Sequence, residues 1–421
     1  MIQVEHESNL GKLLAASPFG DEQDLFLHNQ TKETRVTFMD VEENRYSVYT
    51  NEFWTSKQRQ GNSLHEIAYR ACFKPQLPNL FIKILSTPDD LVYDPFAGRG
   101  TTAIEAAILN RNVVSNDINP LSSILTKPRL HIPDIQKLEK KLDEIKMNEE
   151  AKADIDLSMF YHFKTEAEIV SLREYLRKRK KSKEEDEIDA WIRMIATNRL
   201  TGHSSGFFSV YSLPPNQAIF PERQTKINKE RNQKPEYRDT KSIILRKTKT
   251  LLRDMSPRLV NILREVGKKA IFLENDARNM KEINHDSIQL TVTSPPFLDV
   301  VQYADDNWLR CWFNHVDPDE VGRKITMARG IPEWTQVMRE VFVELHRITK
   351  PGGYVAFEVG EVRNGKLRLE QFVLPLGKQA GFNCLAVMIN EQKFTKTANI
   401  WGVSNNSKGT NTNRIVVFQK P

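Results

Sequence analysis

Several kinds of feature are scarce in this sequence. Its 421 residues include only three cysteines, Cys72, Cys311 and Cys384, which lie too far apart to form a metal-binding pair. No apolar run approaches the roughly 18 residues of a membrane span. The first residues lack the basic start and apolar centre of a secretion signal. These absences predict a reduced, cytoplasmic protein.

Positive charge is present in excess, and it is concentrated in one segment. The net charge is +6, but residues 223–253 alone hold eleven Lys or Arg against three carboxylates. A polyphosphate partner favours such a cluster, because neutralising phosphates releases counterions. A solvated helix face or a mobile loop is the alternative. A polar loop near the end of the chain offers one further candidate. The candidate nucleic-acid-binding residues are Arg223, Lys226, Lys229, Arg231, Lys234 and Lys408.

Alternating strand and helix patterns predict an α/β fold around a mostly parallel sheet. Two additional strand patterns precede it, at 34–39 and 46–49. The alternation stops at about residue 130, and a charged, mainly helical, basic insertion occupies 131–268. We therefore predict one α/β domain from 65–130 and 269–421, preceded by an extension at 1–64 whose role is open. The predicted strands of the domain are 91–93, 112–115, 270–273, 288–292, 353–359, 383–389 and 414–418, with helices at 77–85, 101–110 and 242–266.

The first informative motif is the run from Asp94 to Thr102, which follows an apolar strand. Its glycines permit a sharp strand-to-helix turn and a close approach of backbone to ligand. Asp117 ends the next strand, where an acidic residue can bind ribose hydroxyls, and Asp276 ends a third strand. Carboxylates at three strand ends favour a cationic cofactor, S-adenosylmethionine rather than NAD. Each aspartate alone could be a turn or helix cap.

The second motif is Thr293-Ser-Pro-Pro-Phe297, which also follows an apolar strand. A hydroxyl at Ser294 and the carbonyl of Pro295 could accept both hydrogens of an exocyclic amino group. Its lone pair would then point at an electrophilic methyl group, and the prolines would hold the acceptors in place. Phe297 offers a face for stacking on a base turned out of its helix. A proline-stiffened loop without chemistry is the alternative interpretation.

These motifs resemble those of the DNA amino-methyltransferases, which act on cytosine N4 or adenine N6. Asp94–Thr102 is similar to their cofactor motif, and Thr293–Phe297 is similar to their catalytic [Ser/Asp/Asn]-Pro-Pro-[Phe/Tyr/Trp] tetrad. Phe73-Lys-Pro75 resembles the segment that closes over the methionine end of the cofactor, and Lys350-Pro-Gly-Gly353 is usual for methyltransferases at its position. The resemblance covers about 65–130 and 270–421.

The resemblance implies a Rossmann-like methyltransferase with a large helical insertion, S-adenosylmethionine as cofactor, double-stranded DNA as partner and no metal. It implies catalytic roles for Ser294, Pro295, Pro296 and Phe297. It implies cofactor contacts by Phe73, Lys74, Asp94, Phe96, Gly98, Gly100, Thr101, Asp117, Asp276 and Ala277.

Serine in the first tetrad position favours cytosine N4 over adenine N6. An RNA base methyltransferase and a non-catalytic nucleic-acid-binding protein are the alternatives. The family also suggests a restriction endonuclease encoded nearby and association with a bacterial or archaeal nucleoid. The insertion precedes the strand that ends at Asp276, whereas the related arrangement places target recognition after it. Whether 131–268 recognises DNA is therefore open.

Overall fold

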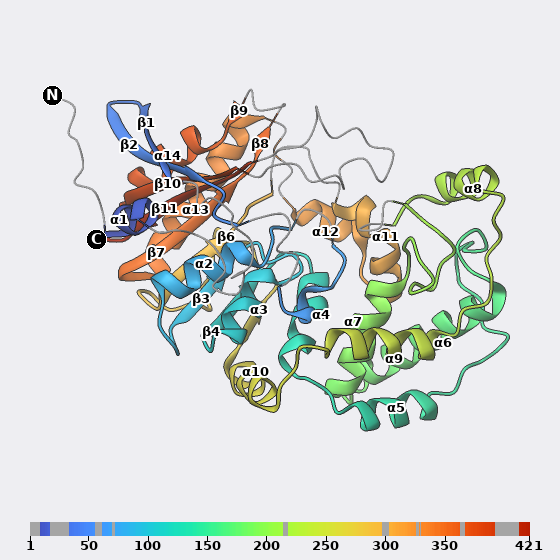
Figure 1. Cartoon of the computed structure of the whole chain (residues 1–421). Helices are drawn as coiled ribbons and strands as arrows, with labels where there is room; N and C mark the ends of the chain where they lie inside the picture. The colour runs from blue at the N-terminus through green and yellow to red at the C-terminus, as the bar shows by residue number, and fades with distance from the viewer. Residues whose placement is uncertain are drawn as a thin grey trace.

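A nine-stranded sheet with the strand order β1-β2-β10-β11-β7-β6-β3-β4-β5 runs through the molecule (Figure 1). The computed structural model describes residues 9–16, 33–54, 61–69, 72–213, 218–296, 303–325, 328, 330–362, 367–391 and 412–421. The strands of the sheet are β1 (Arg35–Val41), β2 (Asn44–Asn51), β3 (Leu91–Asp94), β4 (Asn112–Asn116), β5 (Ile271–Leu273), β6 (Ile288–Thr293), β7 (Thr349–Val359), β10 (Asn383–Glu391) and β11 (Thr412–Gln419). A separate hairpin pairs β8 (Glu361–Val362) with β9 (Leu367–Arg368).

The central strands run parallel, as the alternating sequence pattern predicted. β5, β4, β3, β6 and β7 form a continuous parallel series. β11 then runs antiparallel between β7 and β10. The Rossmann-like α/β fold is therefore confirmed. The two additional strand patterns form the hairpin β1–β2, which extends the sheet because β2 pairs in parallel with β10.

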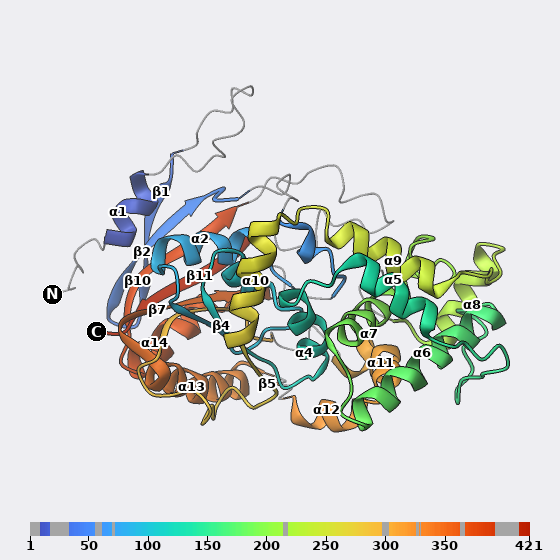
Figure 2. The same cartoon turned by 90° about the horizontal axis from the view of Figure 1, so that it is seen from below.

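Helices cover both faces of the sheet, as Figure 2 shows. One face carries α2 (Gln76–Leu85), α3 (Thr101–Ile108) and α10 (Pro257–Lys269), and the other carries α13 (Ile331–Ile348) and α14 (Glu370–Gln379). Two buried hydrophobic clusters fill the space between sheet and helices. The chain also forms α1 (Asn9–Ala16), α4 (Leu121–Thr126) and the short 3-10 helices η1 (Ser63–His65) and η2 (Lys127–Leu130). Because parallel strands end at the same edge, this arrangement brings the turns after β3, β4, β5 and β6 together.

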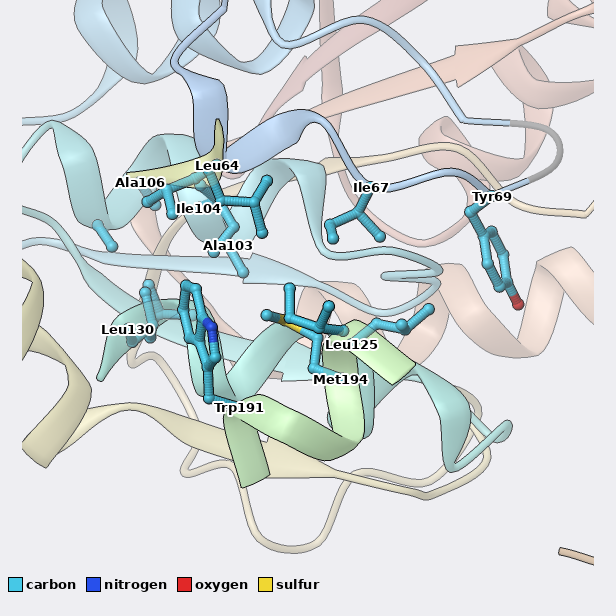
Figure 3. Close-up of a cluster of buried hydrophobic side chains, with 14 of the residues drawn as sticks. Leu64, Ile67, Tyr69, Ala103, Ile104, Ala106, Leu125, Leu130, Trp191 and Met194 are labelled. Atoms are coloured by element: carbon cyan, nitrogen blue, oxygen red, sulfur yellow. The ribbon is translucent and has the colours of Figure 1, made fainter. Parts of the chain in front are cut away.

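A helical region lies to one side of the sheet (Figure 1). It contains α5 (Ile135–Glu144), α6 (Phe163–Lys181), α7 (Glu187–Arg199), α8 (Pro221–Glu230) and α9 (Thr240–Leu251). Two later helices, α11 (Tyr303–Asn314) and α12 (Pro318–Lys324), contact each other, and α11 packs on α6 and α7. Figure 3 shows Trp191 and Met194 of α7 in one buried cluster with Leu64, Ile104 and Leu125. The helical region and the sheet domain therefore share a hydrophobic core.

One detail of the helical region differs from the sequence prediction. The helix expected at 242–266 is interrupted, because α9 ends at Leu251 and α10 begins at Pro257. Ser256 caps the new helix by accepting a hydrogen bond from the Leu259 amide, and proline suits its first turn. The segment at 221–230 forms α8, in keeping with the mainly helical insertion predicted at 131–268.

Candidate active site

The turn after β3 requires glycine at two positions. Gly98 has φ +51° and Gly100 has φ +74°, a region that other residues adopt only with strain. Gly98 lines a cleft at the edge of the sheet. Gly100 faces the opposite way, and a Cβ there would collide with the side chain of Thr126 on α4. Gly98 is therefore placed to approach a ligand, whereas Gly100 allows α4 to pack against the turn.

Asp94, the last residue of β3, lies beneath this turn. Its side chain is buried, and its Oδ1 accepts hydrogen bonds from Thr293 Oγ1 at 2.7 Å and from the Phe96 amide at 3.1 Å. Its other oxygen, Oδ2, is buried without a hydrogen-bond partner. Burial raises the pKa of Asp94 to about 7. An unpartnered carboxylate oxygen in this position would be stabilised by a proton or by a cationic ligand.

Asp117 and Asn116 connect three strand ends. Asp117 Oδ2 accepts the Gly98 amide at 2.8 Å, and its Oδ1 accepts the Asn119 amide at 2.9 Å. Burial raises the pKa of Asp117 to about 6. Asn116 Nδ2 donates to the carbonyls of Pro95 and Asn275 at 3.1 and 3.0 Å. Sequence reasoning missed Asn116, although a polar residue at the end of an apolar strand is a usable signal.

The cleft has a volume of about 900 Å³, including space open to solvent. Seven residues predicted from sequence line it: Phe96, Gly98, Asp117, Asp276, Ala277, Ser294 and Pro296. Six others are outside its lining: Phe73, Lys74, Asp94, Gly100, Thr101 and Pro295. Phe297 and Lys408 lie outside the described residues. The lining residues that sequence reasoning missed are Tyr69, Pro95, Ile118, Asn275, Arg278, Lys324, Ile325, Ala328, Trp334, Val337, Met338 and Val341.

Asp276 is held by a neighbouring arginine. Arg278 Nε donates to Asp276 Oδ1 at 2.9 Å, and Arg278 Nη2 donates to Oδ2 at 2.6 Å. The hydrogen bonds from Arg278 keep the pKa of Asp276 below its usual value. Both residues line the cleft. Asp276 is therefore a fixed, ionised carboxylate at this edge of the sheet.

Ser294 follows β6 and contacts a buried carboxyl group on the neighbouring strand. The parallel pairing of β6 with β7 places Thr293 opposite Phe357, so that Ser294 and Glu358 follow side by side. The Ser294 hydroxyl donates a hydrogen bond to Glu358, and Asn413 Nδ2 donates to Glu358 Oε1 at 2.9 Å. Burial raises the pKa of Glu358 despite these hydrogen bonds. Glu358 was missed, although a charged residue within an apolar strand was a visible signal.

Trp334 supports the proline pair from the other side of the cleft. It lies in the first turn of α13, is buried, and lines the cleft. Its Nε1 donates to the carbonyl of Pro296 at 3.1 Å. This contact fixes the direction of the backbone immediately after Pro295. No local sequence pattern distinguishes Trp334 from an ordinary core tryptophan.

The other predicted cofactor residues occupy supporting positions. Phe73 and Lys74 precede α2, and the ring of Phe73 packs against the hydrophobic core. Thr101 is the buried first residue of α3, and its hydroxyl accepts Arg99 Nε at 3.3 Å. These contacts stabilise the surroundings of the turn.

The predicted basic residues form an exposed face on and after α8: Arg223, Lys226, Lys229, Arg231 and Lys234. Two contacts hold the helix beneath them, Gln224 Nε2 to the Tyr211 carbonyl at 3.0 Å and Asn228 Nδ2 to the Met159 carbonyl at 2.7 Å. The Arg231 guanidinium lies 3.9 Å from the centre of the Tyr211 ring. An ordered helix, α8, therefore carries part of the basic face.

Within the described ranges, no helix is long and apolar enough to cross a membrane. In the same part of the chain, no group of three or more His, Cys, Asp or Glu side chains is arranged to hold a metal ion.

Comparisons with known proteins give matches in sequence and in structure. A family model for N6 and N4 methyltransferases, described as DNA methylase, matches residues 19–123. The Type II methyltransferase M.MjaII of Methanocaldococcus jannaschii is 34% identical over 86 residues, which are 20% of this chain and 16% of that protein. TrmN from Thermus thermophilus is similar over 85% of this chain and 52% of its own, with 13% identity and a TM-score of 0.32. A SAM-dependent methyltransferase from Methanosarcina mazei matches with 12% identity and a TM-score of 0.30, over 81% of this chain and 96% of its own.

The chain thus spans less than two thirds of M.MjaII and of TrmN. The region matched by the family model includes the turn after β3 and the aspartate at the end of β4. Over residues 19–123, which contain the first of the two motifs, the chain is therefore similar to the DNA amino-methyltransferases.

Proposed function

We propose that this protein transfers a methyl group from S-adenosylmethionine to an exocyclic amino group of a base extruded from double-stranded DNA, with cytosine N4 preferred over adenine N6. One observation carries the proposal. Residues of the cofactor-type turn, Phe96 and Gly98, and residues of the catalytic tetrad, Ser294 and Pro296, line the same cleft. A methyl donor and an amino group held by these two motifs would be neighbours.

The residues around the turn fit a cationic nucleoside cofactor. The buried, unpartnered Oδ2 of Asp94 can attract a positively charged group near the turn. Asp117, whose oxygens already accept two amides, is fixed where it can receive ribose hydroxyls on its remaining lone pairs. Asp276 and Ala277 line the same cleft, and we assign Asp276 to the adenine ring of the cofactor. When bound, S-adenosylmethionine supplies the electrophilic methyl group.

The tetrad residues would prepare the amino group. Because the Ser294 hydroxyl gives its hydrogen to Glu358, its lone pairs are available to an amino hydrogen in the cleft. The carbonyl of Pro295 is assigned to the second amino hydrogen, and Trp334 restrains the adjoining peptide. Two such acceptors draw the nitrogen lone pair away from the ring and toward the methyl group. Phe297 is assigned to stacking on the base.

Two further features support cytosine in DNA as the substrate. Serine at 294 favours cytosine N4, because family members that act on adenine more often carry aspartate or asparagine there. The exposed basic face on and after α8 is suited to the DNA backbone, since its cations can replace the counterions of the phosphates. Together, these features narrow the proposed reaction from methylation of an amino group to methylation of cytosine N4 in DNA.

The test is to sequence DNA from cells that express the protein, with detection that distinguishes N4-methylcytosine from N6-methyladenine. We expect N4-methylcytosine at a defined sequence, and no mark with Ser294→Ala. Purified protein should also methylate duplex DNA and leave tRNA and rRNA unmodified. N6-methyladenine would overturn the base assignment, and methylation of RNA alone would overturn the DNA assignment.

A further inference from the structure

Three arginines surround the loop between α7 and α8. The Arg199 guanidinium stacks 3.9 Å from the centre of the Phe207 ring. Arg238 Nη1 donates to the Phe207 carbonyl at 2.9 Å, and Arg246 Nη2 donates to the Ser205 carbonyl at 3.1 Å. We name Arg199, Arg238 and Arg246 the arginine collar. The collar includes none of the basic residues assigned above to the face on and after α8.

The loop inside the collar is held in a defined shape. Phe207 and Phe208 are buried and anchor it, and a Cβ at Gly202 would collide with the Phe207 ring. The Phe208 amide donates to the Arg199 carbonyl at 2.8 Å, which joins the loop to the end of α7. The tip of the loop, Ser204 and Ser205, is exposed. The collar therefore presents a small polar tip that is fixed before any ligand arrives.

Two carboxylates act electrostatically on the collar, Glu66 on Arg199 and Glu236 on Arg238, but neither is close enough to form an ion pair with it. Among the residues that the structure describes, none of the three collar guanidinium groups forms an ion pair. The pKa of Arg199 falls to about 9, because its guanidinium is buried and lies near Arg310. The adjacent Lys247 has one carboxylate, Glu66, at 3.6 Å, and Glu66 is shared with Arg253 at 2.7 Å. Burying the Arg199 guanidinium without an ion-pair partner is unfavourable, so an anionic ligand would stabilise this part of the collar.

The collar is also adjacent to the cleft. Asn198, next to Arg199, donates through Nδ2 to the Ala68 carbonyl at 2.9 Å. The following residue, Tyr69, lines the cleft, and the Arg310 guanidinium lies 5.5 Å from its ring centre. The end of α7 next to the collar is therefore connected to the cleft through Asn198, Ala68 and Tyr69.

We propose that the arginine collar binds a phosphodiester of the DNA backbone beside the extruded nucleotide. The proposal rests on the proposed function and adds a site to it. Guanidinium groups suit this ligand, because their planar N–H groups match two phosphate oxygens at once. The seryl hydroxyls at the tip add donors of the kind that commonly contact phosphates. Base stacking is not available here, since both phenylalanine rings are buried.

The experiment measures binding of the full chain to a fluorescent, random-sequence DNA duplex by anisotropy over a range of KCl concentrations. The variant is Arg246→Gln, because Arg246 is exposed and its replacement removes one hydrogen bond to the loop but leaves the buried anchors Phe207 and Phe208 in place. Losing one phosphate contact should reduce the slope of log K against log salt by about 0.9. Arg246→Lys, which keeps the charge, should recover most of the slope. The matched control is Arg177→Gln, an exposed arginine on α6 that is paired with Glu174 at 2.5 Å and should leave the slope unchanged.

Affinity for S-adenosylmethionine, measured by calorimetry, should be the same in all four proteins. If Arg246→Gln has the wild-type salt slope, or if Arg177→Gln loses as much slope, the proposed phosphate site at the collar is refuted. The proposed function would remain intact. If the wild-type protein binds no duplex at all, the proposed function fails and the collar fails with it. Inorganic phosphate that abolishes duplex binding equally well in wild type and Arg246→Gln would also count against the collar.

Discussion

The Thr293 hydroxyl donates a 2.7 Å hydrogen bond to the buried carboxyl group of Asp94, across 199 residues of sequence. Each residue ends a strand, and β3 and β6 are parallel neighbours in the sheet. The bond therefore ties the residue that begins the cofactor-type motif to the residue immediately before the catalytic tetrad. Residues of both motifs line the cleft, whereas the buried side chain of Asp94 is outside its lining.

Replacing Asp94 by asparagine should weaken binding of S-adenosylmethionine about 10- to 100-fold, because hydrogen bonds to charged groups contribute about 1.5–3 kcal/mol. The variant can still accept the hydrogen bond from Thr293, so the fold should survive. Isothermal titration calorimetry measures the loss. Asp286→Asn, which alters an exposed carboxylate paired with Lys420 at 2.6 Å, is the matched control. Equal affinity of Asp94→Asn and wild type would contradict the role of Asp94.

Cofactor affinity should depend on pH through Asp94 and Asp117, whose pKa values burial raises to about 7 and about 6. A cation binds their ionised forms better, so affinity should fall as the pH is lowered from 8 to 5, and binding near pH 6.5 should release protons. Calorimetry in buffers of different ionisation enthalpy measures that release. Proton uptake on binding, or an affinity that is flat over this range, would refute the assignment.

The same raised pKa values affect stability with a definite sign. The folded protein holds these protons more tightly than the unfolded chain, so these two groups stabilise the fold at low pH. Their contribution is fully present below the ordinary value of 3.8, and it is lost as the pH rises through about 6 and 7. Urea unfolding of wild type and Asp94→Asn at several pH values isolates the contribution of Asp94 to the free energy of unfolding. The difference in this free energy between the two proteins should change between pH 4 and 7. A constant difference would contradict the raised pKa of Asp94.

Glu358→Gln should lower the rate of methyl transfer about 100-fold, the lower end of the range for groups that assist proton movement. Glutamine keeps the size of the side chain but can donate a hydrogen bond to Ser294, which reverses the direction in which the hydroxyl is held. Affinity for S-adenosylmethionine should be unchanged. Glu391→Gln, at an exposed carboxylate on β10 paired with Arg35, serves as the control. A Glu358→Gln variant with the wild-type rate and pH profile would show that the contact is only structural.

Trp334→Phe should slow methyl transfer while preserving an aromatic wall in the cleft. The variant loses the hydrogen bond to the Pro296 carbonyl, which contributes about 1 kcal/mol to stability. Trp191→Phe is a matched control, because Trp191 is also buried and donates to Thr248 Oγ1 at 2.9 Å, and neither residue lines the cleft. Both variants should lose similar stability in urea unfolding, and only Trp334→Phe should lose activity. Equal activity in the two variants would remove Trp334 from the site.

The strand ends were predictable from the sequence, because local hydrophobic patterns mark each strand and parallel strands end at one edge. The positions of Gly98 and Asp117 followed from that rule. The contacts of Glu358 and Trp334 could not be predicted from that rule, because they depend on which strands are neighbours and on how α13 packs. The hydrogen bonds from Arg278 to Asp276 were also unpredictable, because they depend on side-chain conformation in the folded protein. The break between α9 and α10 was recoverable from Ser256-Pro257, a common start of a helix.

The most direct test of the shared cleft compares two quantities in Ser294→Ala, the affinity for S-adenosylmethionine and the transfer of its radiolabelled methyl group to duplex DNA. The structure places Ser294 in the cleft but outside the turn after β3. We expect wild-type affinity together with at least a 100-fold loss of transfer. Full transfer activity in Ser294→Ala, or wild-type protein that binds no S-adenosylmethionine, would contradict the account.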